Sequence, residues 1–419
     1  MKREECDVGS GGMVYDKEGT QEWNEYFGDI KRDPIHKNTR DRSPKIEPFL
    51  PTVKELFIRY NLSAVRIHDG SNYSQLNLSN SSLYKLVIKE ESIERGLRCP
   101  IDKNEIQIFF SLTDYRNNLF TSNDPRKIME FYNGFHSRDE LIEWMKERPK
   151  GVPWIREVSG QKDIIVVIPT ADFNGKYAKE CRDNIFKGLH LIFVESGGKN
   201  DFYFNFAHYV NTGIKKALEY NPKWIIYSGD DMYKIDDVEQ LRISLSAIPE
   251  NVDVVYAVSP ENRFSDPTYI GRPTFIYGIL NFIRGKKGIP KNIQKKFHLD
   301  LEIISDFFIK PRFLKPLVKF LIVRPLKKNS TFIHISSFGI FSSKFIKNSE
   351  GQIFDEVYIN ANEDIDLSYR ISTQSINTTQ INYKIGDLIG KTLGLGIDRY
   401  LRGISGSVYF FSKWHANFE

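Results

Sequence analysis

The sequence predicts an α/β protein whose core is a mainly parallel sheet flanked by helices. Two observations lead to this prediction: apolar runs of strand length recur from residue 161 onward, and polar segments with helical patterning separate them. Such alternation is typical of parallel sheets with right-handed crossovers. Ligands of these sheets bind beyond the carboxyl ends of the strands, so the polar residues that end each strand are the candidates for function.

Four strands of this sheet are expected between residues 163 and 258. They are the runs DIIVVIPT (163–170), LIFVES (191–196), WIIY (224–227) and DVVYAV (253–258). Their continuous apolar and β-branched composition suits strands that are buried on both faces. The segment 204–220 has apolar residues at helical spacing, and Pro222 prevents the helix from continuing.

The chain before this sheet has weaker patterns. Residues 1–50 are polar and rich in turn-forming residues, which predicts a loosely ordered extension. Residues 51–155 predict an appended N-terminal α+β region that ends at KERPKGVP. Its expected elements are strands at 63–67, 85–88 and 106–112 and helices at 125–131 and 138–146, the last capped by Ser137. The main domain is expected over 156–419, in three parts: 161–260, an insert at 261–330, and 331–419.

Composition and charge exclude several classes of protein. The chain has 419 residues, of which 40% are hydrophobic and 27% charged, so it is neither fibrous nor wholly disordered. Its net charge of +5 is too small for a surface devoted to nucleic acid, and no nucleic-acid partner is expected. The three cysteines are far apart, which fits a reducing compartment and excludes a zinc ribbon. Without a signal-peptide pattern or an apolar run of about 18 residues, a cytoplasmic location is expected.

Carboxylates end two of the expected strands. Glu195 ends the second strand, and Asp230 and Asp231 end the third. All three should therefore meet at one edge of the sheet. Adjacent aspartates there suit Mg²⁺ or Mn²⁺, because hard divalent cations prefer oxygen ligands. The alternative is a solvated turn, since Ser-Gly-Asp-Asp also has turn-forming chemistry.

The ordered motifs around these carboxylates resemble the donor half of family 2 glycosyltransferases, which have the GT-A (Rossmann-like) fold. The motifs are Pro169-Thr170, Glu195-Ser196-Gly197, Asn211-Thr212-Gly213-Ile214 and Ser228-Gly229-Asp230-Asp231. The resemblance implies that a nucleotide-diphosphate sugar is bound by Pro169, Thr170, Glu195, Ser196, Asn211, Gly213 and Asp230. It also implies a metal on Asp230 and Asp231. Ser228 stands where the family often has an acidic residue, which leaves open which aspartate is the main ligand.

Residues 338–371 resemble the acceptor half of the same family. The stretches FGIFSSKFI and FDEVYINANEDIDLSYRI look like its acceptor loop and its Glu-Asp motif. Glu363 and Asp364 would lie in the first turn of a helix, where the helix dipole favours their ionised form. The resemblance implies that Asp364 is the general base of an inverting transfer, with Glu363 the second candidate. The alternative is that both carboxylates have only a structural role, in which their negative charges interact favourably with the helix dipole.

The same helix has a predicted cap and a predicted buried side. Asn362 is expected to cap its N-terminus, because asparagine side chains accept hydrogen bonds from the first-turn N–H groups. Leu367 and Ile371 should face the core, and Asp366 and Arg370 should face elsewhere.

The C-terminal stretch RYLRGISGSVYFFSKWH resembles the end of many members of the family. Arg399, Arg402 or Lys413 could reach the donor diphosphate through charge-assisted hydrogen bonds. His415 could be a further metal ligand; the alternative is an exposed terminal residue.

The insert carries most of the excess positive charge. Residues 284–328 contain 13 Lys and Arg against 3 Asp and Glu, a net +10, interleaved with Phe, Leu and Ile. The pattern predicts a basic helical insert that contacts an anionic membrane surface. The alternative is a helical subdomain with a solvated basic face.

The resemblance, with these observations, implies a metal-dependent, inverting glycosyltransferase of glycan or polysaccharide biosynthesis. Its acceptor would be a hydroxyl or a phosphate, on a glycan or a lipid-linked molecule, and its location cytoplasmic and peripheral on the inner face of the cell membrane. One alternative is a sugar-nucleotide pyrophosphorylase, which would carry a glycine-rich loop after the first strand; PTADFNGKYAKE has a single glycine. The other is a non-enzymatic, membrane-associated scaffold with a degenerate transferase fold. The presence of Asp230, Asp231, Glu363 and Asp364 together argues against degeneration.

Overall fold

The computed structural model describes most of the chain from residue 112 onward and three short segments before it. The described residues are 13–16, 64–68, 105–109, 112–197, 201, 203–260, 264, 267–272, 275, 289–305, 315–318, 320–321, 330–388 and 397–418. They fall into two compact units. The first comprises Met1–Phe131 with Lys199–Tyr203, and the second comprises Tyr132–Gly198 with Phe204–Glu419.

The first unit contains a three-stranded sheet followed by helices. Its strands are β1 (Met13–Asp16), β2 (Ala64–His68) and β3 (Glu105–Phe109), with β1 antiparallel and β3 parallel to β2. Helix α5 (Leu112–Thr121) follows, and α6 (Pro125–Asn133) begins in this unit. The strand expected at 106–112 ends at Phe109, and Leu112 starts a helix instead. The expected strand at 85–88 and most of the extension at 1–50 lie outside the described residues.

The second unit begins at Tyr132, earlier than the boundary expected after residue 155. Helix α7 (Arg138–Glu147) starts at the expected cap, where Ser137 Oγ accepts a hydrogen bond from the Glu140 N–H at 3.2 Å. This helix packs against α16 (Ile397–Trp414). The Tyr132 hydroxyl donates to the Leu401 carbonyl at 2.7 Å. Contacts with the far end of the chain thus hold residues 132–147 in this unit.

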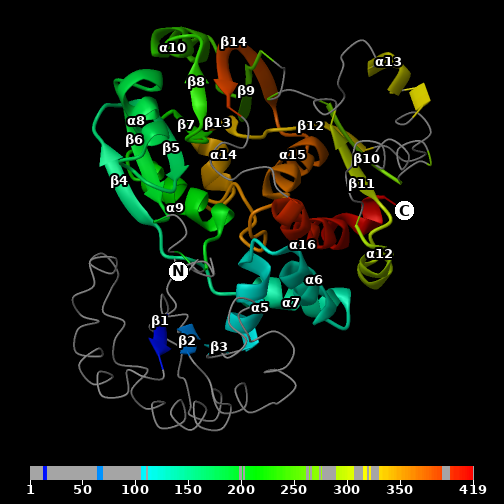
Figure 1. Ribbon diagram of the computed structural model, residues 1–419. Coiled ribbons are helices and arrows are strands. Elements are labelled where there is room, and N and C mark those ends of the chain that lie inside the picture. The colour runs from blue at the N-terminus through cyan, green and yellow to red at the C-terminus, as the bar shows by residue number, and fades with distance from the viewer. Residues whose placement is uncertain are drawn as a thin grey trace. The chain divides into compact units, whose positions relative to one another are not determined.

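An eight-stranded sheet forms the centre of the second unit (Figure 1). Its strand order is β4-β6-β5-β7-β13-β9-β14-β8. The strands are β4 (Trp154–Val158), β5 (Gln161–Thr170), β6 (Leu189–Glu195), β7 (Trp224–Ser228), β8 (Met232–Lys234), β9 (Val254–Val258), β13 (Phe338–Ser342) and β14 (Thr378–Asp387). All four strands expected between residues 163 and 258 are present, as β5, β6, β7 and β9.

The sheet is mixed, whereas the sequence predicted a mainly parallel one. Strands β6, β5 and β7 are parallel neighbours, and so are β9 and β14. Strand β13 lies antiparallel between β7 and β9, and the edge strands β4 and β8 are also antiparallel to their neighbours. The reason at β13 is its connection. The chain leaves β9 at one end of the sheet, and β13 starts at that same end, so the two strands are antiparallel. A parallel β13 would have to start at the opposite end, which requires a crossover connection.

Helices cover both faces of this sheet and give three layers (Figure 1). One face carries α8 (Lys176–Glu180), the π-helical turn η6 (Cys181–Ile185) and α10 (Val238–Ser246); the other carries α9 (Phe206–Leu218), α14 (Ser343–Asn348) and α15 (Glu363–Thr373). Successive residues of β5 alternate between the two cores: Val166 and Ile168 pack into the first, and Ile165 and Val167 into the second. This explains why the strand is apolar at every position.

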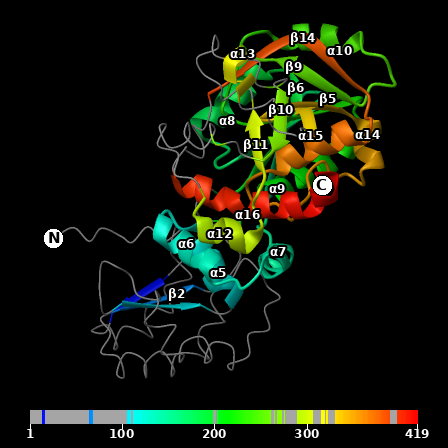
Figure 2. The same ribbon diagram turned by 90° about the vertical axis from the view of Figure 1, so that its right-hand side faces the viewer.

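The basic insert is helical only in part, which corrects the expectation of a helical insert. Strand β10 (Pro267–Gly271) pairs antiparallel with β11 (Glu302–Ser305) and with β12 (Ser330–Ile333). Figure 2 shows these strands beside the short helix α12 (Lys291–Phe297). The apolar, β-branched residues of β11 pair in register with β10. The prediction of a helical insert did not take their strand-forming preference into account. Among the described residues, no helix is long and apolar enough to cross a membrane.

Candidate functional site

The carboxyl ends of β5, β6 and β7 bring three of the predicted site residues together. Thr170 lies opposite Glu195 in the β5–β6 register. The Thr170 hydroxyl donates to Asp230 Oδ2 at 2.8 Å, and its carbonyl accepts from the Ser196 N–H at 3.0 Å. We call the edge formed by the carboxyl ends of β5, β6 and β7 the rim. Pro169 lies one residue before it, paired with Val194. The predicted convergence of Glu195 and Asp230 at one edge of the sheet is therefore observed.

Glu195 shapes the loop that follows β5. Its Oε1 accepts a hydrogen bond from the Phe173 N–H at 3.1 Å, and its Oε2 accepts from Arg156 Nε at 3.2 Å. The carboxylate is largely buried between these two donors. A carboxylate that binds a loop N–H and a guanidinium keeps the loop in one position, so Glu195 orders the entrance to the rim.

Asp230 and Asp231 are held differently, although they are neighbours. Asp230 is buried and bound by Thr170, and its carbonyl accepts from the Cys181 thiol at 3.3 Å. Asp231 is anchored through its backbone, where its carbonyl accepts from the Leu388 N–H at 2.9 Å. Within the described part of the chain, the Asp231 carboxylate makes no hydrogen bond. Asp231 is thus the carboxylate of the pair that is available to a ligand.

Four carboxyl groups act electrostatically on the buried side chain of Tyr227. Burial raises the pKa of Tyr227 well above its ordinary value, and the negative charges of Glu363, Asp364, Asp387 and Asp231 raise it further. These groups come from α15, the end of β14 and the turn after β7. The first two were predicted as catalytic and the last as a metal ligand. Residues of both predicted carboxylate pairs thus influence the same buried tyrosine, and Asp387 joins them.

Asp387 is the residue that the sequence analysis missed. It ends β14, is buried, and accepts a hydrogen bond from the Ser337 hydroxyl. The Ser337 carbonyl in turn accepts from the Gly229 N–H at 2.8 Å, beside Asp230. Its signal was an aspartate at the end of a strand, as for Asp230. The alternating pattern of β14, which is exposed over its first half, concealed that strand.

Helix α15 starts without the expected cap. Asn362 adopts a left-handed conformation with φ of 68°, and its side chain makes no capping hydrogen bond. Its Nδ2 instead donates to Ser407 Oγ at 3.1 Å, on α16. The positive φ turns the side chain away from the first-turn N–H groups, so the prediction of an Asn362 cap was wrong. Asn362 ties the start of α15 to α16.

Glu363 keeps a proton near neutral pH. Its side chain is buried, and its Oε2 has no hydrogen-bond partner among the described residues. Burial, followed by the charge of Asp364, raises its pKa to about 8, while Arg399 on α16 opposes part of this rise. The helix dipole was expected to favour the ionised form of Glu363. This expectation fails, because the effect of burial on its pKa outweighs that of the dipole.

Asp364 makes a contact that the sequence did not indicate. Its Oδ2 lies 2.9 Å from Nε2 of His334, and its Oδ1 accepts from the Ile365 N–H at 2.8 Å. His334 follows directly after β12. Nothing in the local sequence distinguishes it from an ordinary strand-end histidine, because its partner is 30 residues away.

Asp366 is buried, contrary to the expectation that it faces away from the core. It accepts hydrogen bonds from Tyr358 Oη at 3.1 Å, from Trp414 Nε1 at 2.8 Å and from Lys413 Nζ at 3.0 Å. Lys413 also binds Asp355 at 2.8 Å. Burial would raise the pKa of Asp355, but the bonds from Lys413, the Val357 N–H and the Tyr409 hydroxyl outweigh it and hold the pKa below its ordinary value. The ammonium group of Lys413, predicted to bind the donor, thus joins α16 to α15 and to the loop before it.

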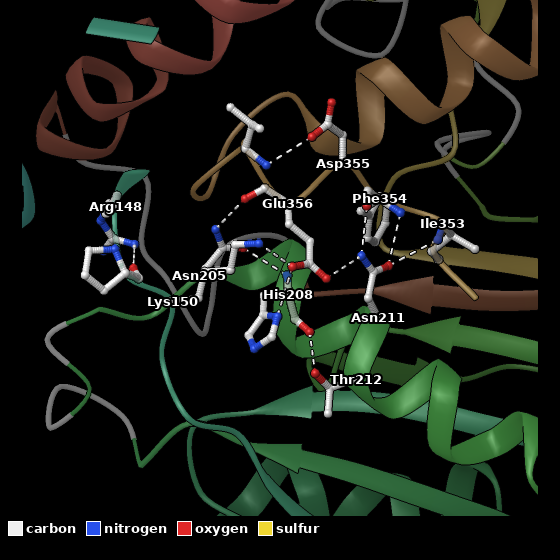
Figure 3. A network of polar contacts seen from close by, with 12 residues as sticks. Arg148, Lys150, Asn205, His208, Asn211, Thr212, Ile353, Phe354, Asp355 and Glu356 are labelled. Carbon is white, nitrogen blue, oxygen red and sulfur yellow. Dashed lines mark hydrogen bonds and ion pairs between the residues drawn. The ribbon is translucent and has the colours of Figure 1, made fainter. Parts of the chain in front are cut away.

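Two further predicted donor residues lie in the framework behind the rim. Asn211 Nδ2 donates to the Phe354 carbonyl at 2.8 Å and to Glu356 Oε1 at 3.1 Å (Figure 3). Gly213 packs so closely on the sheet that a Cβ there would lie 2.5 Å from Val167 Cγ1. Both positions hold α9 against the sheet and against the 353–356 segment.

Glu356 is the centre of this framework. Its Oε2 lies 2.6 Å from Lys150 Nζ and 3.1 Å from His208 Nδ1 (Figure 3). Burial alone would raise the pKa of Glu356, but the hydrogen bonds from His208, Lys150 and Asn211 hold it far below its ordinary value. Glu356 is therefore a permanently ionised link between α9 and the segment that precedes α15.

The donor set at the rim suits a hard divalent cation. Asp231 offers a carboxylate without a hydrogen bond and Asp230 lies beside it, and Mg²⁺ or Mn²⁺ usually takes one or two carboxylates and completes its shell with water and phosphate. His415 is exposed in the turn η12 (His415–Asn417). No group of three or more His, Cys, Asp and Glu side chains arranged to hold a metal occurs in the described ranges.

Comparison with known proteins adds no family to this description. A scan of the chain against models of protein families finds no match, and a search of curated proteins finds none either.

Proposed function

We propose that this protein is an inverting glycosyltransferase with a GT-A fold, which transfers a sugar from a nucleotide-diphosphate sugar to an acceptor. One observation supports this most directly. Asp231, from one predicted carboxyl pair, and Glu363 and Asp364, from the other, all raise the pKa of the buried Tyr227 on β7, a strand that runs parallel to β5. The first pair suits a metal-bound diphosphate, and the second suits activation of an acceptor.

On the donor side, Asp231 and Asp230 would hold Mg²⁺ or Mn²⁺, and that ion would neutralise the charge that develops on the leaving diphosphate. Thr170 fixes the orientation of Asp230 through its 2.8 Å hydrogen bond. Glu195 holds the Phe173 backbone, which orders the loop above the strand ends. These residues prepare a rigid surface for the diphosphate, so that little reorganisation is needed when the donor binds.

On the acceptor side, the Asp364 carboxylate and the imidazole that it contacts would take the acceptor proton. Glu363 is already protonated at neutral pH and would serve as a hydrogen-bond donor. A single displacement with one base inverts the configuration at the anomeric carbon. Arg399, whose charge acts on Glu363, lies on the same side and would offset the negative charge of the rim.

A membrane-bound acceptor is part of this proposal. Within the described part of the insert, the side chains of Leu317 and Phe320 are 53% and 57% exposed. They lie in the 284–328 segment, which carries a net charge of +10. Exposed apolar groups among cations suit the surface of an anionic leaflet. A glycan acceptor carried on a lipid would be presented there.

The test is incubation of the full chain with a panel of nucleotide-diphosphate sugars and Mn²⁺ or Mg²⁺. Release of nucleoside diphosphate is measured with and without extracted lipid acceptors. We expect release from a subset of donors, and its loss in Asp231→Asn. Asp139→Asn is the matched control, because Asp139 is an exposed aspartate on α7, paired with Arg138. Release of pyrophosphate from a nucleoside triphosphate and a sugar 1-phosphate would instead identify a pyrophosphorylase.

A further inference from the structure

His334 is placed against the predicted base. Its Nε2 lies 2.9 Å from Asp364 Oδ2, and the two side chains are only 16% and 28% exposed. The other carboxylate oxygen, Oδ1, accepts from the Ile365 N–H at 2.8 Å. Both oxygens of Asp364 are therefore already engaged. His334 therefore lies directly against the oxygen that would otherwise face an acceptor, while each oxygen keeps a second lone pair.

The backbone around His334 is fixed at both ends. The N–H of Ile335 donates to Ser368 Oγ at 2.9 Å, and the Ser368 hydroxyl donates to the Asp364 carbonyl at 2.6 Å. At the other end of the segment, the Ser337 carbonyl accepts from the Gly229 N–H at 2.8 Å. Residues 334–337 thus bridge the first turn of α15 and the turn that carries Asp230 and Asp231.

The hydrogen bond determines which ring nitrogen carries the proton. An ionised carboxylate only accepts hydrogen bonds, so Nε2 of His334 must be the N–H that donates to Asp364. Nδ1 then holds a lone pair. Among the described residues, Nδ1 has no hydrogen-bond partner. An imidazole with a bare nitrogen and a carboxylate on its other nitrogen is the arrangement of a general base with its orienting group.

We propose that His334 Nδ1, oriented by Asp364, is the atom that takes the proton from the acceptor; the inference rests on the proposed glycosyl transfer. In this step the acceptor oxygen bonds to the anomeric carbon. The bond from that carbon to the diphosphate oxygen breaks, and its electron pair leaves with the diphosphate. The proton of the acceptor hydroxyl passes to Nδ1, and Asp364 stabilises the imidazolium that forms. The nucleoside diphosphate and the glycosylated acceptor are the products.

The surroundings also select the class of acceptor. Asp364 and Asp387 bear negative charges that act on the buried Tyr227, whereas burial favours the uncharged form of Glu363 and the proposed metal would neutralise Asp231. An anionic phosphate acceptor would be repelled by these charges and would need no base. A neutral hydroxyl needs a base and meets no repulsion. The acceptor is therefore a hydroxyl group, as on a sugar or a glycan.

The tautomer is tested without any substrate. Nitrogen-15 shifts of the ring, assigned to His334 by difference with His334→Gln, should show a protonated Nε2 and a bare Nδ1 at pH 8. The opposite tautomer would overturn the proposal, because Nδ1 could then not accept a proton.

The role in transfer is tested with His334→Gln and His334→Ala. Gln keeps a donor for Asp364 but offers no basic nitrogen, so transfer to a hydroxyl acceptor should fall about 10²–10⁴-fold while donor affinity stays within about threefold. Added imidazole should restore part of the transfer in His334→Ala, which a purely structural role would not permit. His136→Gln is the matched control, since His136 is an exposed histidine paired with Glu140; its transfer rate should equal that of the wild type.

Each result separates this inference from the proposed function. If His334→Gln transfers at the wild-type rate, Asp364 acts alone and the proposal falls, while the glycosyltransferase assignment stands. If His334→Ala loses transfer and donor affinity together and imidazole restores neither, the residue is structural and the proposal also falls. If the wild type releases no nucleoside diphosphate from any donor, the proposed function fails and this role fails with it.

Discussion

Lys413 Nζ lies 3.0 Å from Oδ2 of Asp366, a carboxylate that is fully buried. The two residues are 47 positions apart and join α16 to α15. This pair places the C-terminal helix against the helix that begins with Glu363 and Asp364. The geometry of the candidate site therefore depends on a contact made by the end of the chain.

Removing the lysine should destabilise the second unit. Lys413→Met leaves the Asp366 charge buried, with Trp414 and Tyr358 as its remaining donors. We expect a loss of about 3 kcal/mol in the free energy of unfolding, because an unpaired buried charge is costly. Urea denaturation measures it. Adding Asp366→Asn to Lys413→Met should recover part of the loss. Unchanged unfolding in Lys413→Met would mean that the lysine is free to serve the donor.

Metal binding should depend on Asp231 more than on any other carboxylate of the rim. Its carboxylate is the one without a hydrogen bond in the described structure, so Asp231→Asn should weaken Mn²⁺ binding by at least about tenfold in the presence of a nucleoside diphosphate. The electron paramagnetic resonance signal of free Mn²⁺ reports this binding. Asp139→Asn should bind Mn²⁺ like the wild type. Equal binding by Asp231→Asn and the wild type would exclude Asp231 as a ligand.

Two glycines of α16 should respond differently to the same substitution. A Cβ at Gly406 would lie 2.3 Å from the Ala361 carbonyl oxygen, whereas one at Gly403 would meet only the Ala361 Cβ at 3.6 Å. Gly406→Ala should therefore push α16 from the segment before Glu363 and cost about 1–3 kcal/mol. Gly403→Ala gains the same helix propensity without the clash and should be neutral or stabilising. Thermal unfolding distinguishes them; equal midpoints would contradict the close approach at Gly406.

Glu363 should make the protein less stable as the pH rises. In the unfolded chain this group titrates near pH 4.3, whereas burial raises the pKa of Glu363 to about 8 in the folded protein. Between these values the folded state binds the proton and the unfolded state releases it. Ionisation therefore favours unfolding by up to about 1.4 kcal/mol per pH unit across this window.

The comparison that checks this is Glu363→Gln against the wild type by calorimetry at pH 4 and pH 8. Gln cannot ionise, so the variant should exceed the wild type in melting temperature at pH 8 and approach it at pH 4. Glu143→Gln, at an exposed position, should follow the wild type at both values. A variant advantage that is the same at both pH values would show that Glu363 is ionised in the folded state.

Membrane contact should require both charge and exposed apolar groups of the insert. The full chain should co-sediment with anionic vesicles at low salt and leave them as salt screens the attraction. Leu317→Ser with Phe320→Ser should weaken binding about tenfold without changing release of nucleoside diphosphate from a soluble donor. Ile243→Ser, a 56% exposed residue outside the insert, is the control. Equal sedimentation with neutral vesicles would contradict an anionic surface as the partner.

The sequence by itself determined the parts of this protein that depend on neighbouring residues. Strands β5, β6 and β7 were predicted because burial on both faces requires an apolar side chain at nearly every position. The Ser137 cap was predicted because its hydrogen bond joins residues three positions apart. The convergence of Glu195 and Asp230 at one edge followed from strand direction alone, since parallel neighbours end at the same edge.

Only the tertiary structure decided the features whose partners are distant in the chain. Asp366 was expected to face away from the core, and it is buried because Lys413 and Trp414 reach it from α16. Asn362 was expected to cap α15, and instead it bonds to Ser407, 45 positions later. The pairing of His334 with Asp364 has the same origin. The periodicity of the sequence shows which face of a helix or strand is apolar. It does not show which charged group of another element will contact a buried carboxylate. That contact decides whether the carboxylate is ionised.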